Sequence, residues 1–297
     1  MSSSQGPQEW THVTRKSRKS KNSNQGSPSH SHINSLPVTP RTESLRSPSD
    51  LKVDYDRYRS RWTAETPCLR LRELVSSKAS HLKDINRAIN FGVGTFDPAD
   101  GAWEAKRSTF VQLAAFEIIV EELEKITGKK IECFLQDPVF SASDKSFLSN
   151  LGHTVVEDPA GCDLVNENTF FFGVHLYKPI YTEALAKHLP AIFVGTGWNA
   201  WDALFSSEGL GNMETMHKTY EACEFPQEEF DPAFSTTTIY WKPKAGSKEV
   251  EEETKEETKE ETAGDEKVEK DEKVDKSEKQ KEEEDELSRK LESTTIS

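Results

Sequence analysis

Apolar positions in the middle of the chain form two patterns that follow one another in turn. Short continuous apolar runs cover residues 85–91, 130–135, 153–156, 169–174 and 191–194, and each ends at a glycine or a polar residue. Runs of this length are typical of strands buried on both faces. Helical spacing is found between them, most clearly in 102–127, where Phe110, Leu113 and Phe116 recur at intervals of three residues and Gly128 follows the last turn.

Further helices are predicted at 143–151, where a Ser or Asp can cap the start, and at 179–188, which begins with proline. Residues 51–83 predict two helices divided at Thr66-Pro67, because proline disfavours helix in the residue before it. Ile239-Tyr240-Trp241 predict a last strand at the edge of the sheet, whereas 199–234 has no clear pattern.

Strands that alternate with helices favour a mostly parallel sheet with helices on both faces. We therefore expect an α/β fold, a three-layer Rossmann-like domain over residues 51–244. The flanking stretches are too polar to bury a core, so we expect two disordered arms. These are a basic Ser/Pro-rich arm at 1–50 and a Glu/Lys-rich acidic tail at 245–297.

The formal net charge of −14 arises mostly in the tail, since residues 248–292 alone carry 21 acidic and 11 basic side chains. Overall acidity argues against nonspecific nucleic-acid binding by the whole chain, and no specific nucleic-acid partner is expected. The cysteines, Cys68, Cys133, Cys162 and Cys223, show no CxxC spacing, which favours a reducing compartment. No apolar stretch is long enough for a membrane span, so we expect a cytoplasmic or nuclear protein.

Candidate chemistry gathers where the predicted strands end. In parallel sheets ligands bind beyond the carboxyl ends of the strands. The candidate ligand-binding residues are Gly92, Gly94, Thr95, Asp137, Gly173, Gly195, Thr196 and Trp198, and the candidate catalytic residues are His175 and Tyr177.

Each candidate also has a purely structural interpretation. Gly92-Val93-Gly94 is a ligand-contacting turn or only a tight turn, because Asp97 stands where a dinucleotide fingerprint has its third glycine. Asp137 suits a ribose but also shapes turns before proline. His175 is a general acid/base, a ligand contact, a metal or haem ligand, or a histidine bonded into a loop. Trp198 stacks on a planar ligand or closes a core.

No metal site is expected, because no second His or Cys has ligand spacing. The chain also lacks GxSxG, P-loop, HExxH and CxxC motifs, so no catalytic motif identifies an enzyme.

In their order, four motifs resemble the SRR-like (sensitivity to red light reduced) family, and we expect a fungal member. They are INFGVGTF, FLQDPVFSASDKSFLSNLGHTVV, FFFGVHLYKPIYTEAL and AIFVGTGWNAWD, within about residues 69–201. Trp10-Thr11-His12-Val13 is similar to the family's short opening motif. The family pattern Met-Pro-His-Cys is replaced by Gly173-Val174-His175-Leu176, and Gly-Asn-Ser by Gly195-Thr196-Gly197. His175, Gly92, Gly94 and Asp137 thus carry over, but a thiol beside the histidine does not.

The resemblance implies a regulatory protein, with light and circadian roles in plants, growth and microtubule phenotypes in yeast and haem-linked regulation in animals. We expect a ligand- or partner-binding crevice in the domain and protein partners for the arms, in which Ser27-Pro28, Thr39-Pro40 and Ser47-Pro48 suit proline-directed kinases. One alternative is a methyltransferase-like enzyme with S-adenosylmethionine, or a nucleotide, at Gly92, Gly94 and Asp137. A haem-responsive sensor centred on His175 is the other.

Overall fold

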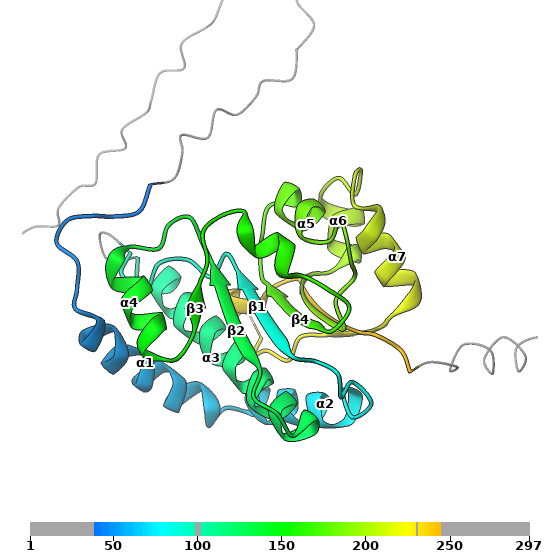
Figure 1. Ribbon diagram of the computed structural model, residues 1–297, viewed down its shortest axis with the longest axis horizontal. Helices are drawn as coiled ribbons and strands as arrows, with labels where there is room; N and C mark the ends of the chain where they lie inside the picture. The colour runs from blue at the N-terminus through cyan, green and yellow to red at the C-terminus, as the bar shows by residue number, and fades with distance from the viewer. Residues whose placement is uncertain (1–38, 99–101, 230, 245–297) are drawn as a thin grey trace, which may run out of the picture. The chain divides into compact units, whose positions relative to one another are not determined.

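The computed structural model describes residues 39–98, 102–229 and 231–244 (Figure 1). The expectations for the basic arm up to residue 38, for Trp10 to Val13, for Ser27-Pro28 and for the acidic tail from residue 245 fall outside these residues.

Local sequence signals set the N-terminal helices. Helix α1 (Pro48–Thr63) begins with proline in its first turn, and the Ser47 side chain accepts a hydrogen bond from the backbone of Asp50. Helix α2 (Thr66–Lys78) again has a proline in its first turn, which confirms the predicted break. The folded part begins before residue 51, because α1 starts at Pro48 and Arg41 already pairs with Asp97.

Helix α3 (Trp103–Thr127) ends at Gly128, whose left-handed backbone makes the predicted C-terminal cap. Helix α4 (Ala142–Asn150) starts with a capping box, in which Ser141 and Asp144 each bond the other's backbone amide. Later in the chain, α5 (Lys178–Ala184) is shorter than its predicted range of 179–188.

The strands form one seven-stranded sheet in the order β3-β2-β1-β4-β5-β7-β6. Strands β1 to β5 pair in parallel, whereas β7 is antiparallel to β5 and β6, so the mostly parallel α/β fold is confirmed. The order reverses between β1 and β4, which is the switch point of a doubly wound sheet. The strands are β1 (Arg87–Phe91), β2 (Glu132–Gln136), β3 (Thr154–Val155), β4 (Thr169–Gly173), β5 (Ile192–Thr196), β6 (Glu221–Glu224) and β7 (Thr237–Trp241).

The prediction that Ile239 to Trp241 form an edge strand is wrong. Strand β7 lies between β5 and β6, with Ile239, Tyr240 and Trp241 all buried. The edge strand is β6, which comes from the stretch without a clear pattern. That stretch also holds α7 (Gly211–Thr219), the short helix η2 (Pro232–Phe234) and most of α6 (Trp198–Leu204).

Two apolar clusters lie on opposite faces of the sheet and make the three layers. Phe170 and Phe172 of β4 belong to the cluster beneath α1 to α4, whereas Phe171 between them belongs to the cluster beneath α5 to α7. This alternation follows from the two-residue period of a strand. Figure 1 shows α1 and α3 on one side of the sheet and α5 to α7 gathered beyond β4. None of the described helices is long and apolar enough to cross a membrane.

Candidate functional site

The turn after β1 brings Gly94 and Asp137 together, as the sequence order suggests, but they bind each other. Gly92 and Gly94 have positive φ angles of 68° and 86°. The Gly94 amide donates to Asp137 Oδ2 (2.7 Å), and the Val139 amide donates to Asp137 Oδ1 (3.0 Å). Burial raises the pKa of Asp137. This carboxylate therefore organises its own turn.

A second carboxylate completes the turn. Asp144, at the start of α4, is fully buried and accepts hydrogen bonds from the Thr95 hydroxyl (2.8 Å) and the Phe96 amide (3.0 Å). The amide of Gly92 donates to the carbonyl of Gln136 (3.0 Å). Several of the amides that would cradle a phosphate are thus already bound within the domain.

Leu176 fills the space beside the glycine turn. Its side chain is 6% exposed and lies against both Gly92 and Gly173, so that a Cβ at either glycine would overlap it. Arg41 also holds the turn in place, because it donates a hydrogen bond to Asp97 Oδ2 (2.7 Å). In this arrangement protein groups fill the cradle, so the turn does not fit a nucleotide or S-adenosylmethionine; the two carboxylates further oppose the anionic phosphates of a nucleotide.

The end of β5 is also tied into the core. Gly195 pairs with Gly173 across the strands, and the amide of Thr196 donates to the buried Tyr181 hydroxyl (2.9 Å). The amide of Trp198 donates to the Tyr240 hydroxyl (2.9 Å), and its ring stacks on His217 with 6.4 Å between centroids. These predicted site residues make structural contacts here.

His175 is the exception, because it is exposed and strained. It follows β4 with a φ of 57°, a left-handed conformation that few residues other than glycine adopt. Its Nε2 lies 2.7 Å from the carbonyl oxygen of Ser235, sixty positions further on. Tyr177, two residues later, is 80% exposed and is the N-cap residue of α5.

The segment that meets His175 is strained as well. Thr236 has a φ of 57°, which is a genuine outlier for a β-branched residue. Its carbonyl accepts the amide of Gly197 (3.1 Å), which holds the start of β7 to the end of β5. Residues held in such conformations are concentrated at functional sites. We call His175, Ser235 and Thr236 the strained edge.

A cavity of about 610 Å³ begins at the strained edge. It is lined by Ser235 and Thr236 and by Glu228, Glu229 and Asp231. Asp231 accepts both terminal nitrogens of Arg107 (2.9 and 3.0 Å), and although burial opposes it, this contact lowers the pKa of Asp231. An acidic cavity suits a cation or a hydrogen-bond donor. Its described lining residues include no lysine or arginine for the anionic propionates of a haem.

The other titratable candidates are poor nucleophiles. All four cysteines are free, and burial raises the pKa of Cys133 to about 12 and that of Cys162 to about 11, so both stay thiols at neutral pH. In the part of the chain that is described, no group of His, Cys, Asp and Glu side chains could hold a metal ion.

Sequence reasoning missed Ser235, Thr236, Leu176 and Asp144. No local signal could identify Ser235, because only the position of β7 next to β5 carries it to His175. Asp144 had a signal, since Ser141 three residues before it is the pattern of a capping box.

One protein-family model, the SRR1 domain, matches residues 71–241 of the chain. No curated protein and no solved structure gives a match. The matched segment is more than half of the chain and spans the sheet from β1 to β7. The strained edge lies inside it, and so do the glycine turn and Asp137. The chain therefore belongs to the SRR1 domain family.

Proposed function

We propose that this protein is a regulatory binding protein, and that its SRR1 domain receives a ligand or partner group at the strained edge. The observation that carries the proposal is the contact between His175 Nε2 and the carbonyl of Ser235 (2.7 Å). It holds an exposed imidazole in a strained conformation against Ser235, which lines the cavity.

This contact determines which ring nitrogen of His175 carries the proton. A carbonyl oxygen can only accept, so in the neutral ring Nε2 is the donor and Nδ1 the acceptor. The described residues supply no partner for Nδ1. An oriented acceptor is thus available to a ligand that carries an N–H or O–H donor.

The same geometry disfavours hydrolytic catalysis. The hydroxyl of Ser235 lies 3.3 Å from His175 Nε2, the distance at which a base could activate a serine. That nitrogen already carries a proton for the Ser235 carbonyl and cannot accept another. No carboxylate among the described residues orients Nδ1, so the third group of a catalytic triad is missing there.

Charge limits the class of ligand. Glu228, Glu229 and Asp231 line the cavity next to the strained edge, and of these only Asp231 is neutralised by an arginine. The site therefore favours a neutral or cationic donor over a nucleotide phosphate. The expected light, circadian or growth process, the protein partners of the arms, and the cytoplasmic or nuclear location remain part of the proposal through the family resemblance.

The test is a ligand screen of the full chain by thermal shift and native mass spectrometry. The screened compounds differ in charge. S-adenosylmethionine carries one more positive charge than S-adenosylhomocysteine, adenosine is neutral, and ATP and NAD are anionic. A ligand at 100 times its Kd raises the free energy of unfolding by about 2.7 kcal/mol. We expect a cationic or neutral compound to bind and the anionic ones to fail.

The variant His175→Ala should abolish that shift, whereas His188→Ala, an exposed histidine beside Glu167, serves as the matched control. If both variants bind the ligand equally well, the strained edge is not part of the ligand site. Methyl transfer to any acceptor by the purified chain would instead support the enzyme alternative.

A further inference from the structure

The outer side of β6 is an open sheet edge. In its antiparallel pairing with β7, Glu221 lies opposite Trp241 and Glu224 opposite Thr238. The Phe225 amide donates to the carbonyl of Thr237 (3.0 Å), so Phe225 points its backbone groups toward β7. In an antiparallel ladder every second residue points its N–H and C=O groups toward the partner strand. Between these residues, Ala222 and Glu224 point their N–H and C=O groups away from the sheet.

Ala222 and Glu224 are both exposed, and among the described residues no strand pairs with the outer side of β6. Pro226 ends the row, since it has no amide hydrogen to donate. The edge is therefore short, with two residues that each offer one donor and one acceptor. Unpaired edges of this kind pair with added strands.

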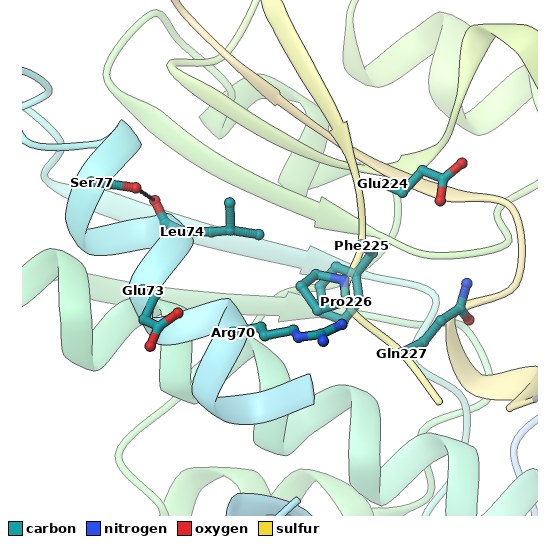
Figure 2. A pocket seen from close by; sticks show the side chains of 8 residues that line it. All are labelled: Arg70, Glu73, Leu74, Ser77, Glu224, Phe225, Pro226 and Gln227. Atoms are coloured by element: carbon teal, nitrogen blue, oxygen red, sulfur yellow. Dashed lines mark hydrogen bonds between the residues drawn. The ribbon is translucent and has the colours of Figure 1, made fainter. Parts of the chain in front are cut away.

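A cavity lies on each side of this edge. The first, of about 620 Å³, separates α2 from the end of β6 and is lined by Arg70, Leu74, Phe225 and Pro226 among others. Figure 2 shows Arg70 and Leu74 extending from α2 toward Phe225 and Pro226.

The second cavity, of about 350 Å³, is bordered by Ala222 and Glu224 together with Asn199 of α6 and Thr238 of β7. It lies over the opposite face of the sheet, because Cys223 and Phe225 pack toward the α1 to α4 layer. Ala222 and Glu224 alternate with them along the strand.

The side chains of an extended peptide point alternately to the two faces of the sheet that it joins. We propose that an extended segment of a partner protein adds to the sheet beside β6 and places alternate side chains in the two cavities. Main-chain hydrogen bonds to Ala222 and Glu224 supply affinity, and the cavities supply specificity. This site does not use His175, although its second cavity shares Thr236 with the strained edge.

Charge indicates what the segment carries. Four carboxylates lie beside β6 or in the segment that follows it, and none of them forms an ion pair with another described residue. They are Glu73, Glu224, Glu228 and Glu229. Arg70 is likewise unpaired there. With more unpaired acidic than basic groups, the edge selects a segment with lysine or arginine.

A second copy of this chain fits less well. Pairing β6 antiparallel with β6 of another copy, centred on the outward-pointing Glu224, would set the two Glu224 side chains opposite each other, and like charges directly opposite are destabilising. The occupant is therefore a basic extended segment of a different protein.

The experiment uses the full chain and a fluorescein-labelled octapeptide of alternating lysine and valine. Fluorescence anisotropy measures its binding, and hydrogen exchange measures protection at the edge. We expect saturable binding with slower exchange at the amides of Ala222 and Glu224. The same peptide with N-methyl groups at alternate residues should bind at least tenfold more weakly, because it loses main-chain donors. A glutamate-valine peptide should not bind.

Variants at one outward position test the same contact from the protein side. Ala222→Pro removes an outward amide hydrogen and leaves the β7 ladder intact, so it should weaken binding at least tenfold. Ala222→Thr keeps the amide and serves as the matched control, with affinity within about twofold. His175→Ala should bind the peptide like the wild type, which separates this site from the strained edge.

Three results would overturn the proposal. In the first, the N-methylated peptide binds as tightly as the parent peptide. Because this comparison uses the wild-type chain, it tests the proposal even if Ala222→Pro fails to fold. No peptide binding could be found up to millimolar concentration. Finally, the wild-type chain alone could form a dimer that Ala222→Pro converts to monomer, which would make a second copy the occupant.

Discussion

Replacing Gly92 by alanine tests whether Leu176 fills the glycine turn. The backbone at Gly92 has a φ of 68°, and a new Cβ would overlap Leu176 Cδ2. A left-handed alanine costs about 1–2 kcal/mol and overpacking about 1–3 kcal/mol, while the stiffer unfolded chain returns about 0.4–1 kcal/mol. We expect Gly92→Ala to lower the free energy of unfolding by about 2–4 kcal/mol.

Gly128 is the matched control. Its φ is also 68°, but no atom lies within 4 Å of the position that a Cβ would take. Gly128→Ala therefore meets only the backbone cost, about 1 kcal/mol. Urea unfolding followed by circular dichroism measures both variants, and in a domain of this size each kcal/mol corresponds to a melting shift of about 2–4 °C.

A double-mutant cycle isolates the contact. Leu176→Ala alone should cost about 2–4 kcal/mol, since the side chain is 6% exposed. Combined with Gly92→Ala it removes the overlap, so the double variant should be more stable than the sum predicts by about 1–3 kcal/mol. If the costs are additive, or if Gly92→Ala equals Gly128→Ala, Leu176 does not occupy the turn and the cradle is open to a ligand.

Three further predictions concern the polar contacts of the domain. Asp144→Ala should cost about 3–5 kcal/mol in urea unfolding, because the buried Phe96 amide and neighbouring donors lose their acceptor; a cost below 1 kcal/mol would contradict this. Ser47→Ala should cost about 1 kcal/mol, since the side chain caps α1, and Ser47→Asp should be nearly neutral in the same assay. The pKa of Asp231 is lowered by Arg107, so this carboxylate stabilises the fold above its unfolded pKa of about 3.9 and stops doing so as the pH falls through its lower folded pKa. The stability difference between wild type and Asp231→Asn should thus be constant from about pH 7 to 5 and shrink below about pH 4; a gap that grows on acidification would refute the assignment.

Local signals accounted for most element boundaries. The break at Thr66-Pro67 and the stop at Gly128 follow from the backbone limits of proline and glycine, which act within a few residues. Strand β1 and helix α3 were expected at 85–91 and 102–127 and are found at Arg87–Phe91 and Trp103–Thr127.

Features that depend on pairing with a distant part of the chain could not be predicted from the sequence. The apolar run at Ile239 is compatible with an edge or an interior strand, and only the pairing of β7 with both β5 and β6 decides for the interior. Strand β6 was not predicted because its sequence is charged and has no apolar pattern. Charged residues are common on edge strands, whose outer side faces solvent.

The sequence by itself determined the α/β class, the order of strands and helices, and which residues stand at strand ends, because these depend on periodicity and on nearby turn residues. The tertiary structure decided what those residues do. It bound Asp137 to Gly94, filled the glycine turn with Leu176, and brought Ser235 to His175. The physical reason is that a hydrogen bond or a packing contact between residues far apart in the sequence depends on strand pairing, for which a single chain carries no local pattern.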